Sequence, residues 1–146
     1  MKNIIVLVII FTTMSCKKEI TFIALKKHVE TGVYDRDDER KGKKYVYQSA
    51  IVVDFPEKKE ELEPLLLNYH NKSIDSIFQD GKVINFLTTF YVKNNKTSYF
   101  IENADDPGGF SSEILIDYYK EFGIAEIKTK RLSNSKELET EVSFVN

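Results

Sequence analysis

The stretch YVYQSAIVV, residues 45–53, is the segment from which the fold can be built outward. Its side chains alternate between two sets, so that Val46 and Val52 would lie on one face and Tyr45 and Tyr47 on the other. A period of two, carried by β-branched and aromatic residues, predicts a β-strand. The neighbouring elements follow from this strand in both directions.

An amphipathic helix is predicted directly after this strand. The apolar spacing i, i+3, i+4 and i+7 is met by Leu62, Leu65, Leu66 and Tyr69. Pro64 leaves two possible starts. A helix that begins near Lys58 would lose the hydrogen bond to Glu60 and kink, whereas one that begins at Glu63 would have proline at its first position. A second short helical turn is predicted after it, capped by Ser73.

The remaining pattern predicts an α+β fold. After the helix, the elements expected are a strand at residues 83–92, a strand at 97–101, a helix at 115–122 and a strand at 124–131. Between Tyr45 and Arg131 this is the ferredoxin-like βαββαβ order, a mainly antiparallel sheet with two helices on one face. Extra terminal strands, at residues 20–25 and 140–144, would widen the sheet at each end.

Composition places the chain among globular proteins of one domain. It has 146 residues, of which 42% are hydrophobic and 12% aromatic, so it can form a core. Its net charge is only -2. Nucleic-acid binding is not expected, because proteins of that class usually carry a basic surplus.

The N-terminus has the layout of an export signal. Lys2 precedes the apolar run IIVLVIIF at residues 4–11, and small or polar residues follow it. This run is much shorter than the roughly 20 residues that a membrane-spanning helix needs. The alternative is that residues 4–11 form a core segment of a cytoplasmic protein.

The sequence Thr13-Met14-Ser15-Cys16 resembles the lipobox of bacterial lipoproteins. It departs from the commonest form at Thr13 and Met14, where leucine and a smaller residue are usual. The resemblance implies cleavage before Cys16 and acylation of its thiol and new amine, which would anchor the protein firmly in a membrane. Lys17 follows the cysteine in place of aspartate, which implies the outer membrane of a Gram-negative bacterium.

This resemblance divides the chain into three parts. Residues 1–15 would be the signal peptide, residues 16–19 a lipidated tether, and residues 20–146 a single domain. Cys16 is the only cysteine, so the lipidated protein would have neither a thiol nor a disulfide.

Catalytic motifs are absent from the sequence. The two histidines, His28 and His70, lie in different elements, and we interpret His70 as an exposed residue at the helix end beside Tyr69 rather than a general base. The chain has no G-x-S-x-G elbow, H-E-x-x-H helix or phosphate-binding glycine loop. This favours a protein without enzymatic activity or a cofactor.

Two acidic clusters offer the oxygen ligands that calcium prefers. They are Asp35, Asp37, Asp38 and Glu39, and Glu102, Asn103, Asp105 and Asp106. The first cluster lacks the glycine and the distant glutamate of an EF-hand loop. We interpret both clusters as solvated loop charges, and no metal site is predicted.

Two surfaces are candidates for binding. One is the loop DDPGGFSS at residues 105–112, where glycines precede a predicted helix; its aspartates would repel a phosphate, and a shaped turn with a capping serine is the plainer interpretation. Its candidate residues are Asp105, Asp106, Gly108, Gly109 and Phe110. The other is a sheet face carrying Tyr45 and Tyr47, whose alternative role is cross-strand packing.

The resulting hypothesis is a lipid-anchored, non-enzymatic module that binds an envelope protein or ligand. Its partners would be the membrane, through Cys16, and a protein of the cell envelope. The alternative is a small envelope hydrolase or sugar-binding enzyme, which would need two carboxylates converging at roughly 5–10 Å.

Overall fold

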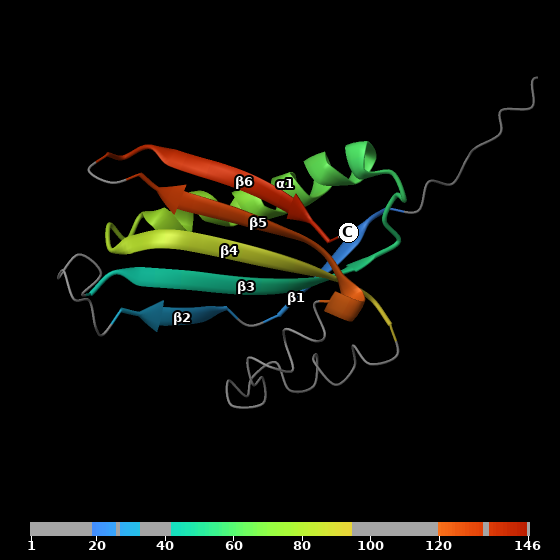
Figure 1. Cartoon of the computed structure of the whole chain (residues 1–146), viewed down its shortest axis with the longest axis horizontal. Coiled ribbons are helices and arrows are strands. Elements are labelled where there is room, and N and C mark those ends of the chain that lie inside the picture. The colour runs from blue at the N-terminus through green and yellow to red at the C-terminus, as the bar shows by residue number, and fades with distance from the viewer. Residues whose placement is uncertain (1–18, 26, 33–41, 95–119, 133–134, 146) are drawn as a thin grey trace, which may run out of the picture.

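One six-stranded sheet, with a long helix across one face, forms the described part of the chain (Figure 1). The computed structural model describes residues 19–25, 27–32, 42–94, 120–132 and 135–145. Its elements are β1 (Thr21–Ala24), β2 (His28–Thr31), β3 (Lys44–Val53), α1 (Lys59–Phe78), β4 (Val83–Val92), β5 (Gly123–Arg131) and β6 (Leu138–Phe144). The strand order is β1-β3-β4-β5-β6, and β2 also pairs with β3.

The sheet is mixed, so the predicted class α+β is confirmed while the ferredoxin-like order is not. Four of the five described strand pairings are antiparallel, but β3 and β4 run parallel and are connected through α1. A split βαβ unit would insert another strand between these two. Here they are direct neighbours, in register from Tyr45 opposite Asn85 to Val52 opposite Val92. Both strands are central and carry buried residues on both faces, as is usual where strands run parallel.

The predicted terminal strands are present at both ends of the sheet. β1 pairs with the second half of β3, and β6 pairs with β5 at the opposite edge. β2 was not expected, and it extends the first edge along the remaining half of β3. The predicted strand at residues 97–101 and most of the second helix lie outside the described residues. Residues 120–122 are helical and lead directly into β5.

The helix α1 is continuous from Lys59 to Phe78, which corrects the expectation of two pieces. Pro64 lies inside the helix, so no amide can donate from position 64 to the carbonyl of Glu60. Ser73 is not a cap but an interior residue, and its Oγ accepts a hydrogen bond from Nζ of Lys27 at 3.4 Å. The helix packs against the sheet beyond Ser73, as far as Phe78. This packing keeps the helix continuous although serine is a common capping residue.

Two apolar clusters form the core between α1 and the sheet. The larger consists of Ala50, Val52, Leu62, Leu66, Phe90, Ala125 and Ile127, and the smaller of Val46, Phe78, Val83 and Phe86. His70 lies on the same face of α1, between the residues that contribute to each cluster. The interior is therefore apolar at both ends and polar in the middle.

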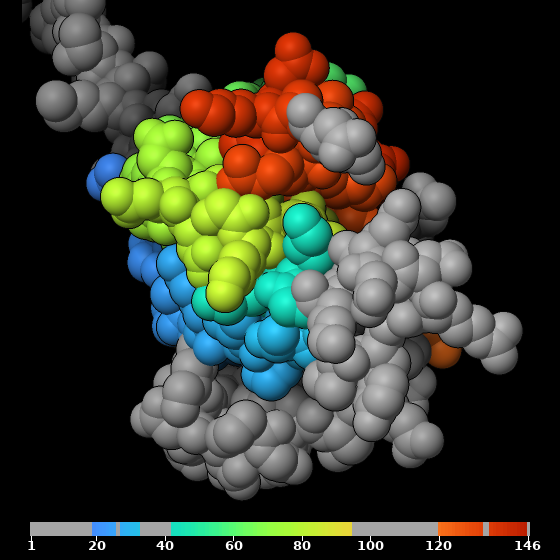
Figure 2. All heavy atoms as spheres, turned by 90° about the vertical axis from the view of Figure 1, so that its left-hand side faces the viewer, coloured from blue at the N-terminus to red at the C-terminus, as the bar shows by residue number. Residues whose placement is uncertain are grey.

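Arg131 of β5 hydrogen bonds to the C-terminal end of α1. Its guanidinium donates to the carbonyl oxygens of Phe78 at 2.7 Å and Val83 at 3.2 Å, and it lies 5.4 Å from the centre of the Phe78 ring. The last turn of α1 has no basic residue of its own. Arg131 therefore supplies the positive charge that a helix C-terminus favours. Figure 2 views this end of the molecule, where the end of α1 (yellow-green) lies beside the start of β6 (red).

Candidate functional site

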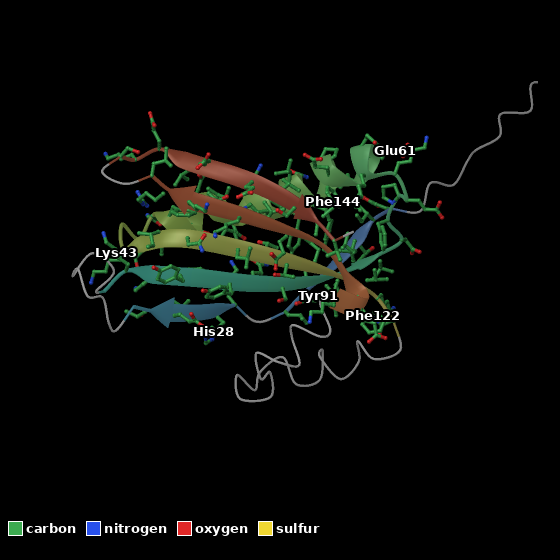
Figure 3. All side chains as sticks on the ribbon, in the orientation of Figure 1. His28, Lys43, Glu61, Tyr91, Phe122 and Phe144 are labelled. Carbon is green, nitrogen blue, oxygen red and sulfur yellow. The ribbon has the colours of Figure 1, made fainter. Side chains whose placement is uncertain are left out.

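The sheet face that points away from α1 carries the first candidate site, and we call it the distal face. It faces the viewer in Figure 3, with α1 behind the sheet. On β3, Val46 and Ala50 are buried in the core. Strand alternation therefore places Tyr45 and Tyr47 on the distal face, as predicted, and both are half-buried. The described residues of this face include His28, Glu30, Tyr45, Tyr47, Asn85, Thr89, Glu126 and Lys130.

An aromatic and polar cluster lies where β2 meets β3. His28 is opposite Tyr47 and Glu30 is opposite Tyr45 in the antiparallel register. The rings of His28 and Tyr47 have centroids 6.3 Å apart, and Nε2 of His28 is 3.6 Å from Oε1 of Glu30. Figure 3 shows His28 at this edge of the sheet. The cluster combines apolar ring area with polar tips, a combination suited to binding a partner.

The pKa of the Tyr47 hydroxyl is raised, first by burial and then by its interaction with the carboxylate of Glu30. A tyrosine hydroxyl is protonated at neutral pH and can act as a hydrogen-bond donor. The cluster offers an aromatic surface with a carboxylate next to it.

Asn85 lies beside this cluster, towards the middle of the distal face. It is opposite Tyr45 on one side and Lys130 on the other. Its Oδ1 is buried and has no hydrogen-bond partner, the one such side-chain atom in the described part of the chain. Buried polar atoms nearly always have a partner. This oxygen is therefore an unsatisfied acceptor within the distal face.

Glu126 of β5 is a second polar residue of the distal face. Burial raises its pKa, while a hydrogen bond from Thr89 at 3.5 Å and the charge of Lys128 act in the opposite direction. A carboxyl group with a raised pKa is suited to donate a proton. A separate hollow lies beside the end of α1, and Asp75 is the one carboxylate among the described residues that line it.

His70 was interpreted from the sequence as an exposed residue, and the structure overturns this. Its exposed fraction is 1%. Nδ1 is 2.7 Å from Oγ1 of Thr88, and Nε2 is 2.8 Å from Oγ1 of Thr129. Thr129 in turn lies 2.8 Å from the hydroxyl of Thr140, and the ring stacks on Phe86 with centroids 4.4 Å apart. Burial lowers the pKa of His70 to about 4, so the ring is neutral and joins α1 to three strands.

Several candidates from the sequence lie outside the described residues. They are Cys16, both acidic clusters, and the loop residues Asp105, Asp106, Gly108, Gly109 and Phe110. In the described ranges, no group of three or more His, Cys, Asp or Glu side chains is arranged to hold a metal ion.

A scan against family models, a search of curated proteins and a search of solved structures each found no match to this chain. No helix within the described ranges is long and apolar enough to cross a membrane.

Proposed function

We propose that this chain is a bacterial lipoprotein, anchored through Cys16, whose domain binds a partner in the cell envelope without catalysing a reaction. The observation that carries the binding role is the distal face, where half-buried Tyr45 and Tyr47 lie beside Glu30 and the unpartnered oxygen of Asn85. The lipobox-like sequence that ends at Cys16 supports the anchor. The membrane proposed is the outer membrane of a Gram-negative bacterium.

The short tether restricts where the partner can be. Thr21, the first residue of β1, is five residues after Cys16. An extended chain spans at most about 3.6 Å per residue, so the domain would begin within about 18 Å of the lipidated residue. The distal face would then meet partners that are close to the membrane surface.

Replacing Cys16 with alanine is expected to release the protein from the membrane or leave it uncleaved, because the thiol that accepts the lipid is gone. Mass spectrometry of the protein from a Gram-negative host should show an acylated N-terminus at Cys16 in the parent chain. Ser15→Ala is the matched control, since it keeps a small residue before the cysteine and should still be processed. A soluble parent protein that retains Met1 would refute the anchor.

A photo-crosslinking amino acid at Tyr47 is expected to give one discrete adduct in intact cells, because this position lies on the distal face. The same amino acid at Asn68, which is exposed on α1, should not give that adduct. The readout is immunoblotting and mass spectrometry of the adduct. Identical products from both positions, or none from Tyr47, would exclude the distal face as the binding surface.

A carboxylate-dependent envelope hydrolase is the second candidate. The raised pKa of Glu126 is the observation that favours it, because a general acid needs a carboxyl pKa above its ordinary value. This mechanism also requires a second carboxylate at roughly 5–10 Å. The binding role accounts for the tyrosines as well, and it is therefore the function we favour.

A further inference from the structure

The edge strand β6 presents a row of backbone groups that bond to no described strand. Leu132 donates its N–H to the carbonyl of Glu137 at 3.0 Å, and Val145 donates to the carbonyl of Ile124 at 3.0 Å. Opposite residues of an antiparallel ladder alternate between bonded and non-bonded pairs. Odd-numbered residues of β6 therefore bond to β5, whereas even-numbered residues direct their N–H and C=O groups outward. These residues are Leu138, Thr140, Val142 and Phe144.

The side chains agree with this assignment. Thr129 and Thr140 are opposite each other in the register and, by the same alternation, form a non-bonded pair. Side chains approach most closely in such pairs, and the two hydroxyl oxygens are 2.8 Å apart. The outward row is thus fixed by two independent observations.

An open hollow adjoins the beginning of this edge, at the end of the molecule seen in Figure 2. It has a volume of about 510 Å³ and lies between the last turns of α1 and the connection from β5 to β6. Ile74, Phe78 and Leu138 give it apolar lining, and Leu138 is 38% exposed. A strand added beside β6 would direct alternate side chains towards this side of the sheet.

We propose that β6 binds an extended peptide segment by strand addition, with an apolar side chain of that segment in the hollow. Charge favours a basic segment, because Glu139 and Glu141 are exposed along the same face of β6. A second copy of this chain fits poorly. Antiparallel pairing centred on Thr140 would place Glu139 of one copy opposite Glu141 of the other, and such like-charge pairs are destabilising. Glu139 and Glu141 are opposite Lys130 and Lys128, so their side chains lie on the distal face, but the open backbone edge and the hollow are separate from the tyrosine cluster. The proposal does not require the lipid anchor.

Hydrogen exchange tests the proposal directly on the full chain, purified in detergent. The probe is the peptide acetyl-Lys-Leu-Lys-Val-Lys-Val-Thr amide. Without peptide, the amides of Leu138, Thr140 and Val142 should exchange much faster than those of Glu139 and Glu141. Saturating peptide should slow the first group by at least tenfold and leave the second group unchanged.

Charge reversal supplies the control for sequence preference. The parent chain should bind the basic peptide about tenfold more tightly than a matched peptide with glutamate in place of lysine, since two cross-strand charge pairs change sign. Glu139→Lys with Glu141→Lys should reverse this preference. Glu57→Lys with Glu60→Lys makes the same change of net charge at exposed positions outside β6 and should preserve it.

Three results would overturn the proposal. The first is rapid exchange of the outward amides at saturating peptide. The second is equal affinity for the basic and the acidic peptide in both double variants, Glu139→Lys with Glu141→Lys and Glu57→Lys with Glu60→Lys. The third is protection of the outward amides in the free chain together with a dimer in sedimentation, which would assign the edge to a second copy. Slow exchange of the backbone amides at positions 139 and 141 in every variant confirms that the sheet remains folded.

Discussion

Replacing His70 with alanine is expected to lower the free energy of unfolding by about 3–5 kcal/mol. The ring is fully buried, and its removal leaves a cavity between the two apolar clusters. It also leaves the hydroxyls of Thr88 and Thr129 without the ring nitrogens they now contact. A loss of this size is a large share of the roughly 5–15 kcal/mol that stabilises a typical domain.

Urea unfolding followed by circular dichroism measures this effect. His28→Ala is the matched control, because it removes the same side chain from an exposed position on β2. Its effect is expected to stay within about 0.5 kcal/mol. If both variants lost less than 1 kcal/mol, the buried network would not be stabilising the helix on the sheet.

The sequence contains a pattern that indicates this network. Leu62, Leu66 and His70 continue one stripe at intervals of four, so the histidine lies on the core-facing side of the helix. Thr88 and Thr129 both fall at inward positions of their alternating strands. A histidine and two threonines at core positions together indicate a buried polar contact, which none of them indicates alone.

The strands with strong period-two patterns, β3, β4 and β5, could be predicted because alternation is local. Their order could not, since a βαβ unit has the same sequence pattern whether or not another strand lies between its two strands. β2 was missed for a related reason. The four residues HVET are exposed and carry no alternation of apolar side chains, and they are a strand because they pair with β3.

The candidate site could likewise be predicted only in part from the sequence. Alternation placed Tyr45 and Tyr47 on one face, and the structure confirms it. Their neighbours Glu30 and Asn85 depend on the register of separate strands, which no local pattern specifies. The unpartnered oxygen of Asn85 could be recognised only once the strands on both sides of it were in place.

Acid is expected to destabilise the folded chain through His70 in a defined pH window. Burial lowers the pKa of His70 from 6.5 to about 4 in the folded state. Between pH 6.5 and pH 4, the folded chain therefore binds fewer protons at His70 than the unfolded chain does. The stabilisation is complete above about pH 6.5 and is lost as the pH falls towards 4. This shift corresponds to about 3 kcal/mol in total, of which about 2 kcal/mol is lost by pH 5.

His70→Gln isolates this contribution, because glutamine can hydrogen bond to the threonines but does not titrate. Glu126 has a raised pKa, so its effect on folding stability runs in the opposite direction as the pH falls. The pKa of Asp80 is lowered chiefly by its hydrogen bond to Lys44, so its effect on stability occurs at lower pH. Both groups are present in the variant and cancel in the comparison. The stability advantage of the parent chain over the variant should therefore shrink by about 2 kcal/mol between pH 7.5 and pH 5. Parallel stability curves over that range would show that His70 does not carry the acid sensitivity.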